Sequence, residues 1–388
     1  MKKNYFMLAA ATMMLAACAE TDLVNEVNTV AEPQAIGFET FANKATRATE
    51  NTKEGYAGNL ETHHKSFKVW ASKQLADNSY VDVYAATSPG TVTYGTAWVA
   101  DPLKYWDKAA ENYQFYAAAP AEASWNATNT NSADGCITLA DYVLKGESKD
   151  NVATLNNSLK GTWGEATTSN DKDLMIAAAC KVSKDHYYNV ANPTAVHLSF
   201  IHLLSKLNIA VNTTAANVML VKLDVCRLNN KSSFNEFADI DGDTDFDNDD
   251  KDALVNGSTK RWGTATLDGT YTLAAAGTPL SLTKGAAAVY THEYLIMPQL
   301  QLRKDDCKGL GTVPTNDAYI DIEYTINGEL YKAYYGLAEV FDIAKDGNLA
   351  FYEGWQNTLT ITISPDAITF TGDVAVWDDN LGKTEDID

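Results

Sequence analysis

The sequence has 388 residues, of which 45% are hydrophobic, and a formal net charge of −21 at pH 7. This length allows two domains with cores of their own, and the apolar content excludes an intrinsically disordered chain. The acidity excludes a nucleic-acid-binding protein, because the chain would repel phosphates, and it disfavours contact between the folded body and a lipid surface.

The first segment is an export signal. Two lysines precede an apolar stretch, Tyr5 to Ala17, that is too short to span a bilayer and ends in small residues. Cys18 follows at once, and the run LAAC (15–18) is typical of a bacterial lipobox, in which the cysteine thiol takes a diacylglycerol. The alternative is an ordinary A-x-A cleavage site with an incidental cysteine. We favour the lipobox, so residues 1–17 are the predicted signal peptide and the lipid on Cys18 is the only predicted contact with the membrane.

A short strand is predicted soon after the signal. Ile36 and Phe38 alternate with small or polar residues, which is the period-two pattern of a half-buried strand. The run then turns polar, and Arg47 lies among small residues that a protease can hold in an extended form. Either this chain end is frayed, or the strand is temporary and is released by cleavage between Arg47 and Ala48. We adopt the second hypothesis, in which residues 18–47 are a propeptide with a displaceable strand.

The rest of the chain reads as many short strands separated by turns. Alternating runs rich in β-branched and aromatic residues recur, with turn signals such as TSPG, NG and DG between them, and helical patterns are few. This pattern of many short strands with turns between them predicts β-sandwiches. We expect an all-β fold with domains at 48–192 and 193–388, divided near the polar loop 184–194. The predicted strands include 66–71, 80–87, 112–120, 173–182, 196–212, 218–228, 270–275, 292–302, 318–326, 329–335, 358–364 and 368–377.

Residues able to carry chemistry form no recognised constellation in the sequence. It contains no hydrolase elbow, phosphate-binding loop or dinucleotide fingerprint. Its six histidines do not combine into a metal site, and solvated loop histidines are the simpler interpretation. We therefore predict that the protein is not an enzyme. Four cysteines beyond the signal lack C-x-x-C spacing, which leaves both disulfides and buried thiols open: Cys136, Cys180, Cys226 and Cys307.

An acidic stretch, DIDGDTDFDNDDKD at 239–252, is the sharpest local anomaly. Carboxylates at every second position match the ligand spacing of a calcium loop, and a divalent ion would relieve their mutual repulsion. Two departures count against this, because Phe246 stands where an EF-hand needs Gly and Asp252 is shorter than the usual Glu. We favour a solvated acidic loop, and calcium, the one cofactor considered, stays the alternative. The candidate ligands are Asp241, Asp243, Asp245, Asp247, Asp249 and Asp252.

Several segments occur together in one order and spacing. They are the lipobox with its following strand, NKATRA (43–48), KYWDKAAENYQFYAAAP (104–120), DLMIAAA (173–179), VHLSFIHLLSKLNIAV (196–211), YLIMPQ (294–299) and the ending WQNTLTITI…VAVWDD (355–379). In this order they resemble the Bacteroidales fimbrillins, the subunits of type V pili and their fimbrillin-like relatives. The resemblance implies two transthyretin-like β-sandwich domains, no catalysis, export as a lipoprotein, trimming by an arginine-specific protease, and polymerisation by strand exchange.

The last predicted strand is the candidate donor for that exchange, within residues 367–379. Its apolar residues alternate on both sides of Gly372, which could act as a hinge. The alternative is that it is simply the last strand of its own domain. The candidate donor residues are Ile368, Phe370, Val374, Val376 and Trp377.

Two functions from different classes remain. We predict a structural subunit of a surface fimbria, located at the cell outer membrane and cell surface, whose partners are other fimbrial subunits, the maturation protease and, if it is adhesive, a host or bacterial surface ligand. The alternative is a surface lipoprotein, such as a tip or anchor subunit or an adhesin, that binds glycan or protein ligands and never polymerises. Arg47 and a C-terminal strand favour the first, because a simple binding lipoprotein needs neither.

Overall fold

The computed structural model describes the chain in segments: residues 34–42, 60, 64–128, 135–144, 173–188, 193–236, 261–266, 272–275, 279–302, 318–341 and 348–376. Contacts divide the chain into two units, Met1–Pro33 and Gln34–Asp388, and every described residue belongs to the second. These residues are mostly β-strand, with the short elements η2 (Lys184–His186) and α3 (Leu337–Val340) beside them, so the predicted all-β fold is confirmed. Within these ranges, no helix is long and apolar enough to cross a membrane.

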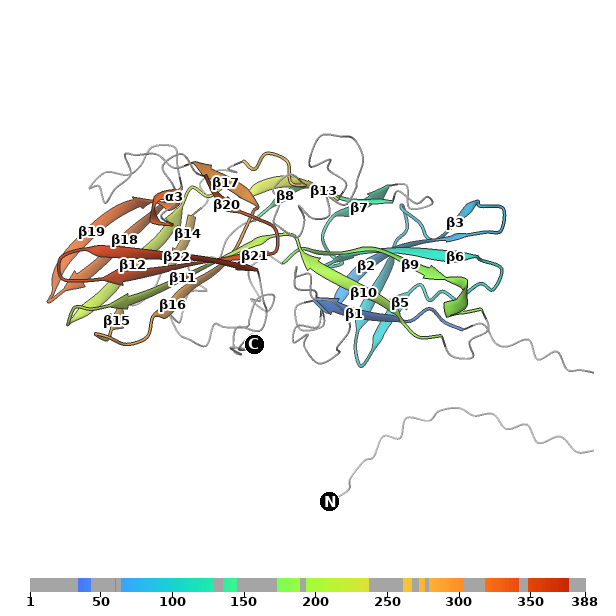
Figure 1. Cartoon of the computed structure of the whole chain (residues 1–388), viewed down its shortest axis with the longest axis horizontal. Helices are drawn as coiled ribbons and strands as arrows, with labels where there is room; N and C mark the ends of the chain where they lie inside the picture. Colours follow the sequence, from blue (N-terminus) through green and yellow to red (C-terminus); the bar gives the residue numbers. More distant parts are fainter. Residues whose placement is uncertain are drawn as a thin grey trace, which may run out of the picture. The chain divides into compact units, whose positions relative to one another are not determined.

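An eight-stranded sheet contains the N-terminal part of the described chain (Figure 1). Its order is β3-β2-β4-β5-β1-β10-β9-β6, and β6 also pairs with β2, so the path closes on itself with β3 outside it. β1 runs parallel to β10, whereas the other pairings are antiparallel. The strands are β1 (Phe38–Ala42), β2 (Ser66–Gln74), β3 (Tyr80–Tyr84), β4 (Gly90–Tyr94), β5 (Trp98–Asp101), β6 (Asn112–Ala119), β9 (Met175–Ser183) and β10 (Val196–His202).

Alternating side chains build the core of this sheet. In β10, Val196, Leu198 and Phe200 are buried while the residues between them are exposed or half-buried, as a strand with one covered face requires. These three belong to one hydrophobic cluster with Ile36 and Phe38 from the N-terminal segment. The first described residues of the chain therefore contribute to the first core.

Two further sheets contain the C-terminal part (Figure 1). One has the order β16-β11-β21-β22, with β11 parallel to β21, and the other has the order β14-β12-β18-β19, with β15 on β12. Buried aliphatic residues from β11, β12, β18 and β21 meet in a second core. The strands are β11 (Ser205–Thr213), β12 (Val218–Cys226), β14 (Thr272–Ala275), β15 (Leu280–Leu282), β16 (Val289–Ile296), β18 (Tyr319–Ile326), β19 (Glu329–Gly336), β21 (Trp355–Ile363) and β22 (Ile368–Val376).

Two small sheets complete the description. β17 (Gln299–Leu302) pairs with β20 (Asn348–Phe351). The other has the order β13-β8-β7 and joins strands from both sides of the predicted 192/193 boundary. Its strands are β7 (Trp125–Thr128), β8 (Cys136–Val143) and β13 (Lys231–Asn235). The predicted division into two sandwiches at that boundary stays a prediction.

The chain passes from the first sheet into the next at Leu203 and Leu204, between β10 and β11. The sequence predicted one unbroken strand over 196–212, and this prediction is wrong. The reason is that both leucines bond elsewhere: Leu203 N donates to Leu174 O (2.8 Å), and Leu204 O accepts from Gly354 N (2.9 Å). Trp262 Nε1 also donates to Leu203 O (2.9 Å), so distant segments fix the break.

Buried charged side chains lie around this passage. His202 Nδ1 is 2.5 Å from Asp173 Oδ2, and both side chains are buried. Arg261 donates from Nε (3.0 Å) and from Nη2 to Glu353 Oε2, and this pair is buried as well. The Arg261–Glu353 pair is costly to break, because the remaining partner keeps an uncompensated charge away from water.

Glu236 is a further buried carboxyl in this region. Its Oε2 accepts a hydrogen bond from Ile137 N (2.8 Å). Burial raises the pKa of Glu236 to about 7, and the hydrogen bond from Ile137 and the charge of Arg261 act in the opposite direction. Arg261 therefore acts on two buried carboxyl groups. It donates hydrogen bonds directly to Glu353, and its charge lowers the pKa of Glu236.

We expect Glu236 to make the folded protein less stable as the pH rises through neutrality. The folded form keeps a proton between the ordinary pKa of 4.5 and about 7, where the unfolded form has lost it. The stabilisation is complete below the unfolded pKa and is lost as the pH passes the folded value. Glu236→Gln keeps an acceptor for Ile137 N and removes the titration. At about pH 8, urea unfolding should show the variant more stable by about 1–3 kcal/mol, with a flatter pH profile.

Glu353→Gln is the matched control. It removes the carboxylate that Arg261 contacts, so it should destabilise the protein by about 3 kcal/mol at neutral pH. Burial raises the pKa of Glu353 to about 6, so this loss should shrink as the pH falls below that value. An unchanged pH profile in Glu236→Gln would show that another group titrates.

Candidate functional site

Strand β1 lies between β5 and β10 in the eight-stranded sheet (Figure 1). On one side its five residues pair with β10, from Phe38 opposite Val196 to Ala42 opposite Phe200. On the other side the register with β5 contains one position, Phe38 opposite Trp98. Within the described residues, β1 is therefore fully paired along one edge and sparsely paired along the other.

The residues just before β1 are also held in place. Ile36 N donates to Lys104 O (2.9 Å), and Trp106 N donates to Gln34 O (2.9 Å). These backbone bonds are the same kind that join strands of a sheet. From Gln34 onward this segment is thus an ordered part of the sheet, and the frayed-end alternative is wrong for residues 34–42.

Two apolar side chains anchor the segment. Ile36 and Phe38 are 2% and 5% exposed, as their alternation predicts. The Phe38 ring packs edge-on against Phe67 (centroids 6.0 Å apart) and Phe115 (5.9 Å). Burying such a side chain contributes about 1.5–3 kcal/mol, and edge-on aromatic pairs add to this. Among the side chains described in this segment, Ile36 and Phe38 therefore make most of the apolar contacts with the core.

Thr40 continues the same alternation but is a poor fit. Its side chain is buried, and its Oγ1 has no hydrogen-bond partner among the described residues. A buried hydroxyl without a partner costs about 1–3 kcal/mol. On the opposite face, Glu39 Oε2 lies 3.2 Å from His197 Nδ1, but both side chains are half-exposed, so this contact contributes little. β1 therefore fits its place in the sheet less well than the two buried side chains Ile36 and Phe38 alone would indicate.

Exposed apolar side chains lie near the start of this segment. Val99, Leu103 and Tyr105 are 60%, 47% and 48% exposed. Tyr105 forms a backbone bridge with Ala35, and Val99 follows Trp98, the partner of Phe38. A continuous patch of exposed apolar side chains is typical of a protein contact site, whereas single exposed ones are common on any surface.

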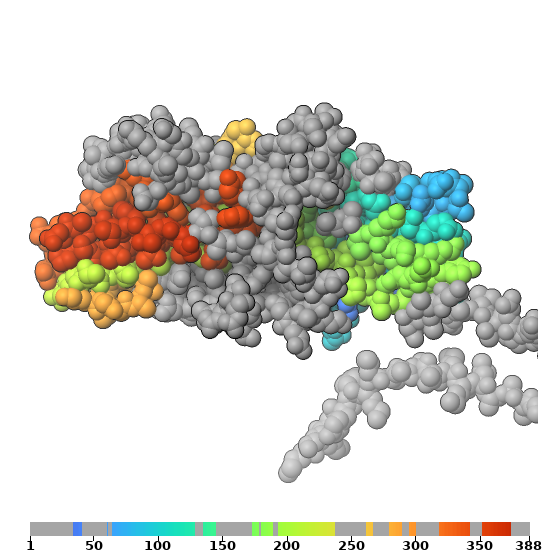
Figure 2. Space-filling model, viewed as in Figure 1, coloured from blue at the N-terminus to red at the C-terminus, as the bar shows by residue number. Residues whose placement is uncertain are grey.

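The candidate donor segment is in its own sheet in this structure. β22 pairs antiparallel with β21 at nine positions, from Trp355 opposite Val376 to Ile363 opposite Ile368, and it is the last strand of that sheet. Phe370 packs edge-on against Tyr335 (4.6 Å). On the face drawn in Figure 2, the red residues 348–376 form much of the visible surface, whereas little of the dark blue residues 34–42 can be seen.

Gly372 lies within the β22 ladder, opposite Leu359. A Cβ atom at this position would be 2.7 Å from Phe341 Cδ1 and 3.3 Å from Phe341 Cα. The glycine is therefore explained in the folded chain by close approach to Phe341. A hinge at Gly372 stays a prediction.

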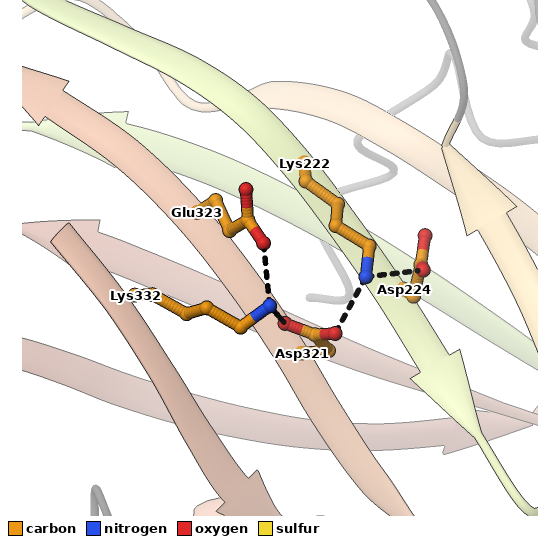
Figure 3. Close-up of polar contacts among 5 residues, drawn as sticks. All are labelled: Lys222, Asp224, Asp321, Glu323 and Lys332. Atoms are coloured by element: carbon orange, nitrogen blue, oxygen red, sulfur yellow. Dashed lines mark hydrogen bonds and ion pairs between the residues drawn. The ribbon is translucent and has the colours of Figure 1, made fainter. Parts of the chain in front are cut away.

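Five charged side chains on β12, β18 and β19 form a network of ion pairs (Figure 3). Asp224 and Asp321 lie opposite each other in the ladder, where like charges repel. Lys222 Nζ lies 3.2 Å from Asp224 and 2.5 Å from Asp321, while Lys332 Nζ lies 3.8 Å from Asp321 and 2.6 Å from Glu323. Burial lowers the pKa of Lys222, but hydrogen bonds to Asp321 and Asp224 hold it above its usual range. We interpret this network as structural.

Several predicted site residues lie outside the described part of the chain. Within that part, no group of three or more His, Cys, Asp or Glu side chains could hold a metal ion, and the calcium prediction concerns other residues. Cys136, Cys180 and Cys226 are not joined by disulfides. Val374 and Val376 lie in β22. The residues not described are Cys18, Arg47, Ala48, Cys307, Trp377 and the six aspartates Asp241, Asp243, Asp245, Asp247, Asp249 and Asp252.

Two features of the site were not predicted. One is Thr40, although it continues the Ile36–Phe38 alternation and could have been found by extending it. The other is β10, which was predicted as a strand but not as the partner of β1. The sequence carries no local signal for that pairing, because alternation shows which side chains are buried and not against which strand.

Comparisons with known proteins give one family. Residues 46–377 match a family model described as fimbrillin-like. No curated protein matches the chain. Similar solved structures include a fimbrial protein from Bacteroides vulgatus (13% identity, 89% of this chain and 100% of that one, TM-score 0.49) and a proposed cell adhesion protein from Bacteroides uniformis (14%, 89% and 98%, TM-score 0.41). With TM-scores below 0.5, these likenesses carry no argument about function.

Thr40→Val should stabilise the full-length, uncleaved protein. The change replaces a buried hydroxyl without a partner by a methyl group of similar shape, which should raise the free energy of unfolding by about 1 kcal/mol. Thr40→Ser is the control, because it keeps the hydroxyl, removes the methyl and should destabilise. Urea unfolding measures both. A less stable valine variant would show that the hydroxyl has a partner in solution.

Proposed function

The chain belongs to the fimbrillin-like family, and from this premise we propose that it is a structural subunit of a surface fimbria that assembles with other fimbrial subunits. The observation that carries the proposal is the position of β1, a buried strand that ends at Ala42, shortly before the predicted cleavage site at Arg47. A cell-surface location and a fimbrial or adhesive role fit the family.

Export as a lipoprotein is the first step of the proposal. The lipid on Cys18 would hold the precursor at the outer membrane, and two or more acyl chains anchor firmly where one does not. The net charge of −21 would keep the folded body away from an anionic lipid surface. The membrane contact therefore depends on the lipid alone.

Cleavage after Arg47 would change how β1 is held. In the precursor, β1 is joined to β2 through residues 43–65, so it competes with any other strand at an effective concentration on the order of millimolar. After the cut, β1 stays with the lipid-bearing piece and is attached to the body through non-covalent contacts alone. Its loss then becomes an ordinary dissociation, which the sparse pairing with β5 and the buried Thr40 hydroxyl favour.

The position that β1 leaves would require another strand. The edge of β10 and the rings of Phe67 and Phe115 would otherwise be exposed, and such edges bind extended segments by β-strand addition. The proposed donor is the C-terminal segment 367–379, which contains β22. Its place as the last strand of its sheet means that its release would break one ladder and not two.

A second candidate function rests on separate observations. The nine paired positions of β22 favour a segment that stays in its own sheet, and the exposed Val99, Leu103 and Tyr105 suit a protein ligand. These features support a surface lipoprotein that binds glycan or protein ligands without polymerising. The two functions differ in whether the N-terminal piece is removed.

N-terminal sequencing of fibre material tests the proposal. The mature chain should begin at Ala48, and Arg47→Lys should stay uncleaved and form no fibres if the protease is specific for arginine. The lysine variant keeps the positive charge, so a failure to assemble would reflect the missing cut and not a changed surface. Surface material that begins at Cys18 or Ala19 would contradict the fimbrial proposal and support the non-polymerising lipoprotein.

Deletion of residues 367–388 tests the donor. The proposal requires a folded monomer that is cleaved at Arg47 and cannot extend a fibre, as judged by circular dichroism, electrophoresis and electron microscopy. A misfolded product would show that β22 is an indispensable strand of its own sheet. Normal fibres from the truncated protein would show that another segment is the donor.

A further inference from the structure

β19 is the last strand of its sheet, and its outer edge pairs with no other strand among the described residues (Figure 1). Its eight residues, Glu329–Gly336, pair with β18 without a register shift. The first four are exposed, and they include the large apolar side chains Leu330 (59% exposed) and Tyr331 (38% exposed). An open strand edge that carries exposed apolar side chains is a template for pairing with another chain.

The turn before β19 shows which backbone groups face that open edge. The two residues of the loop between β18 and β19 have φ values of 52° and 88°, so the loop is a type I′ turn. Such a turn closes with a hydrogen-bonded pair of flanking residues, here Ile326 and Glu329. Because bonded and non-bonded positions alternate along an antiparallel ladder, Leu330 and Lys332 direct their N–H and C=O groups away from β18.

The features that normally protect an edge strand are missing from β19. It contains neither a proline nor a bulge, and it is long enough for a full ladder. Its one lysine, Lys332, is drawn toward β18, where its Nζ lies 2.6 Å from Glu323 and 3.8 Å from Asp321 (Figure 3). The charge that would repel a partner strand is therefore neutralised by ion pairs within the same sheet.

The charge of this edge suits a second copy of the chain as the partner. The whole chain has a formal net charge of −21, so two copies repel each other. β19 itself carries one acidic and one basic residue, Glu329 and Lys332, and therefore no net charge. At this edge the repulsion is weaker, and each copy offers the other the same unpaired backbone groups and the same exposed apolar side chains.

We propose that β19 pairs antiparallel with β19 of a second copy about a two-fold axis at Tyr331. This contact goes beyond the proposed strand exchange, and it joins the C-terminal sheets of two copies edge to edge. A two-fold axis makes one surface serve both partners, and residues that face each other across it lie on the same face of the sheet. The Tyr331 ring then meets its own copy, and Leu330 lies opposite the second copy's Lys332.

The exposed residues of β19 select this register. It pairs positions 329–333 of the two copies, which include all four exposed residues. Aromatic rings that face each other stabilise an antiparallel pair, and Leu330 can pack on the aliphatic stem of the lysine opposite it. An axis at Lys332 would place two ammonium groups opposite each other, which is unfavourable. An axis at Ala333 would bring the buried Gly336 into the ladder.

Cysteine cross-linking tests the position of the axis. The full-length chain is used uncleaved and carries Cys18→Ser, so that neither a lipid nor that thiol takes part. Tyr331→Cys should form a disulfide-linked dimer on oxidation, because a residue on a two-fold axis faces itself within the reach of a disulfide. Leu330→Cys and Lys332→Cys should each form no dimer alone and should cross-link when they are mixed. Mass spectrometry identifies the linked positions and separates them from the chain's other cysteines.

Analytical ultracentrifugation measures the association without added cysteines. Raising NaCl from about 0.05 M to about 0.5 M should strengthen the dimer about tenfold, because salt screens the repulsion between acidic copies. Tyr331→Glu places two carboxylates opposite each other and should weaken the dimer about tenfold. Thr371→Glu is the matched control, because it adds the same charge at an exposed position of β22, and it should leave the association unchanged.

Circular dichroism shows that each variant is folded before its association is compared. A chain that stays monomeric at every salt concentration would overturn the β19 contact, and so would equal weakening by Tyr331→Glu and Thr371→Glu. A dimer of Leu330→Cys or Lys332→Cys with itself would overturn the axis at Tyr331. Since the proposed fimbria requires cleavage, these measurements on uncleaved protein fail or succeed independently of it.

Discussion

The pairing of β1 with β10 is the contact on which the N-terminal sheet depends. Without β1, the edge of β10 would lose its parallel partner over five residues, and Phe67 and Phe115 would lose the ring that packs between them. An open edge beside exposed apolar side chains is a template for any extended chain. The protein therefore needs a strand in this position from the moment it folds, and it takes that strand from a segment upstream of the predicted cleavage site.

The rest of the fold is held by contacts of a different kind. Around Leu203 and Leu204, the buried contacts Arg261–Glu353 and His202–Asp173 tie distant segments together, and breaking the first would leave a charge buried away from water. β1 lacks such a contact among its described residues and relies on two anchors and one full ladder. β1 is therefore held without a buried ion pair, and it is the segment whose release the proposed function requires.

Local pattern predicts what is buried but not what it is buried against. The alternation of Ile36 and Phe38 was enough to predict a buried strand, and recurring short runs were enough to predict an all-β fold. The parallel partner β10 and the break at Leu203 depend on hydrogen bonds from residues far along the chain, which no local pattern encodes. Glu236 precedes the acidic run and could not be told from the acidic residues that follow it, because burial of a carboxyl depends on tertiary contacts such as Ile137 N.

The same limit explains why the role of β22 is ambiguous from the sequence. The alternating pattern indicates that Ile368 and Phe370 need an apolar surface to pack against. The sheet that contains β22 provides such a surface, and so does the position that β1 occupies. In the function that we propose, acceptor and donor lie in different sheets of each copy, so the contact between copies is heterologous, and such contacts continue into a filament unless a rotation closes them. In that proposal the tethered β1 blocks the acceptor until the predicted cut after Arg47, so a single peptide bond controls assembly without any change in the sequence of the core.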